Sequence, residues 1–218
     1  MNWPLTSLLT LLCAGLLIGC PTGRGDDDDD ATDDDDSAAL DDDDAQDDDD
    51  AAVDFRLWSD ELLSDDGIEH TYDCDQSLPP EHSCWNPNPA ISWEGAPAGT
   101  VAFTLIFDDP TAGDWEHWAV YNIPASADGL AAAISGDGAT GSLPDGAVEL
   151  DNGTGDPGYF GSCPGAVNLY RWRLWAMTEL LTDHPANYAQ LAGDAEAVSA
   201  EMTEMCHVFD GDDADLRR

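Results

Sequence analysis

Three stretches of the chain carry the apolar patterning of β-strands. Val101–Phe107 and Trp118–Ile123 are apolar runs, and Tyr170–Met177 alternates with a period of two residues. In the third stretch the even-numbered positions form an apolar face. Arg171 and Arg173 lie on the opposite face, where we expect them to pair with surface acids. The pattern therefore predicts three strands of a sheet with a buried face.

Glycine-containing turns dominate residues 125–158, between the second and third predicted strands. Four dipeptides of the Asp-Gly or Asn-Gly type occur there, and such pairs favour tight turns. We expect short strands and long loops in this segment. The four pairs are Asp128-Gly129, Asp137-Gly138, Asp145-Gly146 and Asn152-Gly153.

Helical spacing is found near the C-terminus. Asp194 is a candidate N-cap for a helix whose apolar residues recur at intervals of four, three and four, and a shorter helix is expected to begin at Pro185. Strands first and helices last predict a mainly β fold (β-rich α+β). We expect two antiparallel sheets packed as a sandwich with C-terminal helices. The recurring residues of the longer helix are Val198, Met202, Met205 and Phe209.

The chain is strongly acidic. It has 47 aspartates and glutamates against six arginines and no lysine, which gives a formal net charge of −41. Four aspartate runs hold 17 of these acids, and residues 54–218 still hold 30. Contacts with nucleic-acid phosphates need Lys and Arg, so we expect no nucleic-acid partner. An anionic membrane surface would also repel the chain. The runs are 26–30, 33–36, 41–44 and 47–50.

The N-terminal residues have the features of a lipoprotein signal. Residues 1–19 form a signal peptide with an apolar run from Leu5 to Ile18, and Cys20 closes a lipobox. Cys20 is then the lipidated residue of a protein anchored in the bacterial cell envelope. Pro21, the residue after the lipidated cysteine, is not a signal for retention in the inner membrane. We therefore expect the protein to be localised in the outer membrane. The alternative is an uncleaved membrane anchor, but the run is short for a span of about 20 residues.

Residues 20–53 are predicted to form a lipidated, disordered, Asp-rich tether. Few of these side chains can enter a core, and repulsion between like charges favours an extended chain. Binding of divalent cations is the alternative function. A defined calcium site needs spaced ligands around a glycine turn, and no such pattern occurs here. The remaining domain, 54–218, is therefore expected to fold independently of the tether.

Four cysteines remain after processing, since Cys13 leaves with the signal peptide and Cys20 carries lipid. In an oxidising compartment they allow three pairings of two disulfides. A bond from Cys74 to Cys84 closes a short loop, so we favour it together with Cys163–Cys206. The spacings are not those of a zinc site. The histidines outside the candidate pocket are also scattered along the sequence, so no metal site is predicted: His70, His82, His184 and His207.

A candidate pocket lies where the first predicted strand ends. Asp109 follows the end of that strand, and the next apolar run begins at His117, eight residues after Asp109. A turn between the two strands brings the acid and the imidazole together at one end of the sheet. Trp115 is expected to face this pocket. We expect Asp109 and His117 to form a hydrogen-bonded pair in which the carboxylate raises the imidazole pKa and leaves a donor for an anionic ligand.

Several motifs around these residues resemble those of the phosphatidylethanolamine-binding proteins, which include the Raf kinase inhibitor proteins and bacterial relatives. The resemblance covers roughly residues 54–218, and its motifs occur in the family's order. It implies a sandwich of two antiparallel sheets with a ligand pocket at one end of the larger sheet. The motifs are Asn88–Trp93, Pro97–Thr100, Asp109-Pro110, His117-Trp118, Asn122–Pro124, Gly158–Pro164 and Tyr170–Met177.

The resemblance also implies which residues line the site, and where this chain departs from the pattern. Asn168 stands where the family has a pocket histidine, and Leu169 replaces a neighbouring arginine, which predicts weaker phosphate binding. Three further departures are Thr111, Ser162 and Gly165. The expected ligand-binding residues are Asp109, Pro110, Trp115, His117, Gly161, Pro164, Asn168 and Tyr170.

These observations predict an envelope lipoprotein that binds a small anionic or phospholipid-headgroup ligand in a partly degenerate pocket. No cofactor is implied, and no protein partner can be named. One alternative is a protein-interaction module that inhibits a protease or kinase through surface loops, with a vestigial pocket. The other is a hydrolase that uses Asp109 and His117 as a general base. The sequence contains no nucleophile elbow or phosphate-binding glycine loop to support that chemistry.

The lipid anchor is testable with a single substitution. Cys20→Ser removes the thiol that would carry diacylglycerol, so the variant is expected to leave the membrane fraction or to accumulate as uncleaved precursor. Fractionation and gel mobility measure both effects. Membrane partition and mobility equal to those of the parent would contradict the lipoprotein interpretation.

Overall fold

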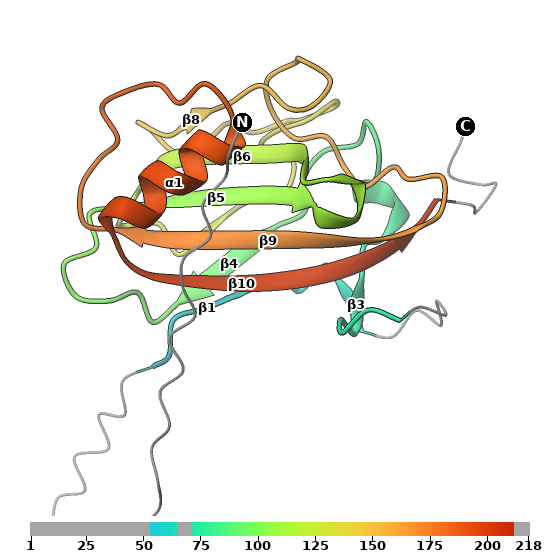
Figure 1. Cartoon of the computed structure of the whole chain (residues 1–218), viewed down its shortest axis with the longest axis horizontal. Helices are drawn as coiled ribbons and strands as arrows, with labels where there is room; N and C mark the ends of the chain where they lie inside the picture. Colours follow the sequence, from blue (N-terminus) through green and yellow to red (C-terminus); the bar gives the residue numbers. More distant parts are fainter. Residues whose placement is uncertain (1–52, 65–70, 212–218) are drawn as a thin grey trace, which may run out of the picture. The chain divides into compact units, whose positions relative to one another are not determined.

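The computed structural model describes residues 53–64 and 71–211, which form two β-sheets and one α-helix (Figure 1). The predicted signal peptide, Cys20 and nearly all of the tether lie outside the described residues. In spatial order, the smaller sheet comprises β1 (Arg56–Trp58), β4 (Ile91–Glu94) and β7 (Gly129–Leu130). The larger comprises β2 (Leu63–Ser64), β3 (Gln76–Ser77), β10 (Ser199–Asp210), β9 (Val167–Met177), β5 (Ala102–Asp109), β6 (Trp115–Pro124) and β8 (Val148–Glu149).

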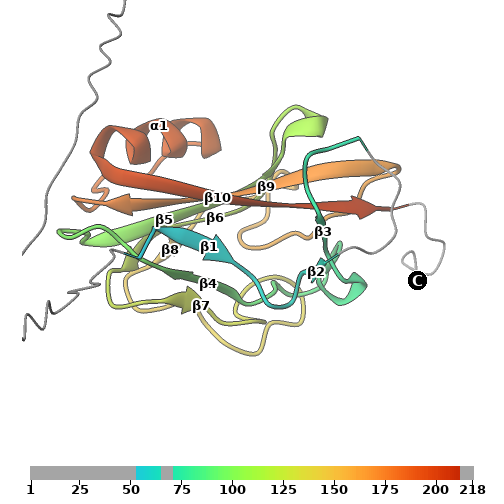
Figure 2. The same cartoon turned by 90° about the horizontal axis from the view of Figure 1, so that it is seen from below.

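The predicted fold class is confirmed. The structure is mainly β, and the two sheets face each other while α1 (Tyr188–Val198) covers the outer face of the larger sheet (Figure 2). Strand pairs are antiparallel except for β3 with β10, which run parallel. Within the described segments, no helix has the length and apolar character to cross a membrane.

Two apolar cores hold these layers together. The core between the sheets includes Trp93 of the small sheet and Phe107, Trp118 and Trp172 of the large one. The second core lies under α1 and includes Leu191 of the helix. All eight residues of β5 are buried, because this strand is central in the large sheet and covered on both faces.

The alternation predicted for the third strand is confirmed in β9. Its even-numbered residues from Tyr170 to Ala176 enter the core between the sheets, while Trp175 and Met177 pack under α1. The short strands predicted for residues 125–158 appear as β7 and β8, separated by long loops. The sheet therefore follows the period-two pattern of the sequence.

The helix predicted from Asp194 is wrong, because the chain becomes a strand at Ser199. The actual helix begins at Tyr188, three residues after Pro185, where the Asn187 side chain accepts a hydrogen bond from the Gln190 N–H. Residues 199–210 instead form β10 along β9. Met205, His207 and Phe209 enter the interior from alternate positions, which is the period of a strand.

The preferred disulfide pairing is also wrong. Cys74 bonds Cys206, and Cys84 bonds Cys163. Both bonds join segments that lie far apart in the sequence, 132 and 79 residues respectively. Cys206 lies on β10, which pairs with β3, and Cys74 lies just before β3. Two disulfides are typical of a domain that folds outside the cytosol.

The pairing makes a direct prediction. Peptide mapping without reduction should recover Cys74 joined to Cys206 and Cys84 joined to Cys163. Replacing both cysteines of either bond by alanine should lower the free energy of unfolding by about 2–5 kcal/mol, because each bond closes a long loop. Recovery of a Cys74–Cys84 peptide would contradict this topology.

Candidate functional site

The site forms at the end of the large sheet where β5 passes into β6. Asp109 ends β5, the 3-10 helix η2 (Pro110–Ala112) makes the turn, and Trp115 begins β6 opposite Asp109. The register shifts between Phe107 and Asp108, which marks a bulge. The extra residue is His117 on β6, and β5 keeps its regular alternation. Asp108 and Asp109 point to opposite faces of β5, and both are buried because both faces of this strand are covered.

The Asp109 carboxylate is held by four neutral donors. Its Oδ1 accepts from the Thr111 N–H at 2.9 Å, the Thr111 hydroxyl at 2.6 Å and the Ala112 N–H at 2.9 Å. Its Oδ2 accepts from Asn168 Nδ2 at 2.7 Å. The first three bonds cap η2 and the fourth reaches β9, so one carboxylate fixes both the turn and the neighbouring strand.

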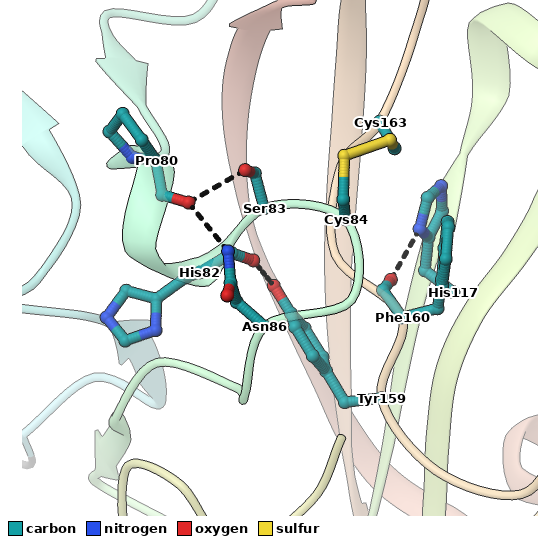
Figure 3. The surroundings of a disulfide bond; sticks show 9 residues. All are labelled: Pro80, His82, Ser83, Cys84, Asn86, His117, Tyr159, Phe160 and Cys163. Carbon is teal, nitrogen blue, oxygen red and sulfur yellow. Dashed lines mark hydrogen bonds between the residues drawn. A yellow bond between two sulfur atoms is a disulfide. The ribbon is translucent and has the colours of Figure 1, made fainter. Parts of the chain in front are cut away.

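The predicted hydrogen-bonded pair of Asp109 and His117 does not form. His117 Nδ1 instead donates to the Phe160 carbonyl oxygen at 2.7 Å (Figure 3). The expected rise in the imidazole pKa is also wrong. Burial lowers the pKa of His117 to about 4, and this effect outweighs the opposing influence of the Phe160 carbonyl and the charge of Asp109. The ring is therefore neutral at physiological pH.

Asp108 carries the ion pairs of this end of the sheet. It accepts from Arg171 Nε at 3.0 Å and Nη2 at 2.8 Å, and it also bonds Arg173. Arg171 reaches a second carboxylate, that of exposed Asp114, at 3.1 Å. The sequence predicted surface acids as the arginine partners, but the main partner is a buried one. The positive charge of both arginines is thus directed to Asp108 and Asp114.

A loop tied to its neighbours supports the far wall of the site (Figure 3). The Tyr159 hydroxyl donates to the His82 carbonyl oxygen at 2.6 Å, and the Gly161 N–H donates to the Cys84 carbonyl oxygen at 2.7 Å. The Cys84–Cys163 disulfide joins the same two segments. Gly161 is required for close approach, because a Cβ there would collide with the His82 carbonyl oxygen.

His207 is a residue that the sequence reasoning missed. It is fully buried behind Tyr170, with the two rings stacked at 4.9 Å between centroids. Trp172 Nε1 donates to His207 Nδ1 at 3.0 Å, which leaves the proton on Nε2 to be donated to Ser162 Oγ at 2.8 Å. Burial lowers the pKa of His207 well below its usual value. The alternation of residues 205–209 was the available signal for its place in a strand.

The site contains a cavity of about 200 Å³ at this end of the large sheet. Six of the eight residues expected at the site line it, so the predicted convergence is seen, while ligand binding stays a prediction. Pro110 begins η2 and Gly161 supports the wall, and neither lines the cavity. The lining residues are Asp109, Ala112, Trp115, His117, Phe160, Cys163, Pro164, Asn168 and Tyr170.

Metal ligation has no support in the described part of the chain. Across residues 53–64 and 71–211, no three His, Cys, Asp or Glu side chains are arranged to hold a metal ion. His82 contacts the Pro87 carbonyl oxygen and Glu61, and His184 contacts the Tyr121 hydroxyl. These histidines serve separate local contacts.

Comparison with known sequences identifies the family. The profile of the phosphatidylethanolamine-binding protein family matches residues 68–207. The chain belongs to this family. A UPF0098 protein of Methanothermobacter thermautotrophicus is 36% identical over 121 residues, which cover 53% of this chain and 78% of that protein. The predicted resemblance is therefore confirmed.

Other members extend the comparison to the bacterial envelope and to solved structures. The putative lipoprotein LppC of Mycobacterium tuberculosis is 32% identical over 142 residues, covering 62% of this chain and 66% of LppC. The crystal structure of Escherichia coli YbcL, described as a new member of the mammalian PEBP family, superposes on this chain with a TM-score of 0.61 at 26% identity. That match covers 72% of this chain and 99% of YbcL's structure. The sequence alignment with YbcL is shorter than the structural one, and it covers 53% of the YbcL sequence.

The protonation of His117 gives a measurable property of this family member. Burial holds the folded pKa at about 4 against 6.5 for an unperturbed ring, so the unfolded chain takes up this proton first as pH falls. The neutral His117 ring therefore makes its full contribution to the free energy of unfolding above about pH 6.5, and this contribution is lost as the pH falls through about 4. The difference corresponds to about 3 kcal/mol of unfolding free energy.

Imidazole nitrogen NMR across pH 8 to 3 tests both the proton position and the titration. We expect a neutral Nδ1–H tautomer that starts to titrate only below about pH 5. A His117 pKa at or above 6.5, or a proton on Nε2 in the neutral ring, would contradict the site geometry.

Proposed function

We propose that this chain is an envelope lipoprotein whose domain binds a small phospho-headgroup-type ligand in the cavity around Asp109. The lipid on the lipobox cysteine, Cys20, would anchor the protein in the membrane, and we propose that this membrane is the outer membrane. The putative lipoprotein LppC among its relatives supports the anchor, and the two disulfides support an extracytoplasmic domain. The cavity carries the proposal, because it brings buried polar groups and aromatic walls together at one opening.

The construction of the walls supports binding by a preformed site. Asp109 is fixed by four hydrogen bonds, and Tyr170 is backed by the stacked ring of His207. The Cys84–Cys163 bond ties the opposite wall. Because little of the lining must be ordered when a ligand enters, less of the interaction energy is lost to conformational entropy.

The same geometry favours binding over catalysis. A hydrolase based on the predicted pair would need Asp109 to orient His117 as a general base. Both oxygens of Asp109 accept from other donors, and His117 is oriented by a backbone carbonyl. We therefore propose a non-catalytic module.

Blocking the cavity mouth tests this function. Ala112 is an exposed residue on the rim, so Ala112→Trp should obstruct the opening without entering a core. Calorimetric titration of the purified full-length protein with phosphoethanolamine should show binding that weakens at least about tenfold in this variant.

The matched control is Ala189→Trp, which adds the same side chain at an exposed position on α1 outside the cavity. We expect this variant to bind as the parent does and to unfold at the same temperature. Binding that survives Ala112→Trp, or a parent protein that binds no phosphoethanolamine, would overturn the proposed function.

A further inference from the structure

We propose that the Cys84–Cys163 disulfide is a redox switch on the cavity wall: a dithiol that reduces it releases the segment around Phe160 and admits water to His117. The switch itself goes beyond the proposed function, because it concerns the wall and not the ligand. Its effect on ligand binding rests on the proposed function.

The position of this disulfide makes it accessible both to the cavity and to solvent. Cys163 lines the cavity and is exposed, and Cys84 is half-buried. In the other disulfide, Cys74 is buried and Cys206 is half-buried. Thiol–disulfide exchange requires an attacking thiolate to reach a sulfur atom. A dissolved dithiol therefore has better access to the Cys84–Cys163 bond.

The disulfide joins two segments that are in direct contact (Figure 3). The Cys84 N–H donates to the Ser162 carbonyl oxygen at 3.1 Å, and the Gly161 N–H donates to the Cys84 carbonyl oxygen at 2.7 Å. Cys84 adopts a left-handed backbone conformation, with a φ of 51°. This conformation is unfavourable for a residue with a Cβ and persists only where surrounding contacts impose it. We expect Cys84 to relax to a negative φ once the disulfide opens, which breaks both hydrogen bonds.

Phe160 belongs to the segment that Cys163 holds, and it transmits the change to His117. The Phe160 N–H donates to the His117 carbonyl oxygen at 3.0 Å, and its own carbonyl oxygen accepts from His117 Nδ1 at 2.7 Å. The two rings are stacked at 6.1 Å between centroids. On its other side, the Phe160 ring contacts that of Trp85, the residue after Cys84, at 4.6 Å. Release of Cys84 therefore loosens a residue that shields the imidazole from water.

The protonation of His117 reports the state of this switch. Burial is the main cause of its low pKa, about 4, whereas Asp109 and Asp108 on β5 favour the protonated ring. Tyr170 on β9 and His207 on β10 also pack near the ring, and both are neutral because burial raises the pKa of the tyrosine and lowers that of the histidine. Water at the ring removes the cost of burial and leaves the attraction of the carboxylates. The pKa of His117 is then expected to rise toward 6.5.

The exchange is balanced when a dithiol is the reductant. One thiolate of the dithiol attacks Cys163 Sγ, the bond between the two protein sulfurs breaks, and Cys84 leaves as a thiolate that takes up a proton. The second thiol of the reductant then displaces Cys163 as a thiol, and the reductant becomes a disulfide. The protein thus gains a pair of electrons and two protons. Both new thiols are mainly uncharged at neutral pH.

A variant that lacks the other disulfide tests the switch without altering the cavity lining. In Cys74→Ala with Cys206→Ala, the Cys84–Cys163 bond is the remaining disulfide among the described residues. Imidazole nitrogen NMR of this purified full-length variant should show a His117 midpoint of about 4 when oxidised. After reduction by dithiothreitol, the midpoint should rise by at least about one pH unit.

Calorimetry on the same two states measures the effect on binding. Phosphoethanolamine affinity at pH 7 should fall at least about tenfold on reduction and return on re-oxidation, because a released wall must be ordered when a ligand enters. The matched control is Cys84→Ala with Cys163→Ala, which retains the Cys74–Cys206 bond. Its His117 midpoint should already be raised, and dithiothreitol should not shift it further.

The outcomes distinguish the switch from the proposed function. An unchanged His117 midpoint in a reduced protein whose NMR spectrum is still that of a folded domain would overturn the switch, as would reduction that unfolds the whole domain. A raised midpoint with unchanged phosphoethanolamine affinity would overturn the effect on binding. A raised midpoint in a protein that binds no phosphoethanolamine in either state would support the switch and overturn the proposed function.

Discussion

The hydrogen bonding of the Asp109 carboxylate is the constraint on which the site depends. One side chain caps η2 through Thr111 and Ala112 and reaches across to Asn168 on β9. These contacts keep the turn between β5 and β6 short and hold β9 beside it. The carboxylate is buried only because each oxygen has a hydrogen-bond donor, since an unsatisfied buried charge would be strongly destabilising.

Asp108 and Asp109 are neighbours with different roles, because consecutive residues of a strand point to opposite faces of the sheet. Asp108 is neutralised by two arginines and links β5 to β9. Asp109 has neutral partners and lines the cavity. His117 and His207 complete the contrast, because burial keeps both rings uncharged and each ring is oriented by hydrogen bonding. At neutral pH the two histidines therefore supply hydrogen-bonding groups and no charge.

Much of this arrangement is predictable from the sequence, and the failures have identifiable causes. The strands of β5, β6 and β9 follow from their apolar patterns, and Asp109 and His117 meet because a short turn joins β5 to β6. The helix expected over residues 194–209 failed because the apolar spacing that predicted it does not match the side chains that enter the interior, which are Met205, His207 and Phe209 at the period of a strand. The disulfide pairing depends on β10 lying beside β3, which is a tertiary contact. The charge state of His117 depends on burial, which the local sequence does not reveal.

The most direct test of this account is a crystal structure of the protein with phosphoethanolamine at pH 7. We expect the ligand inside the cavity at the end of the large sheet, in contact with lining residues such as Trp115, His117 and Tyr170. A ligand bound outside the cavity, or a cavity left empty at a saturating concentration of phosphoethanolamine, would contradict the account.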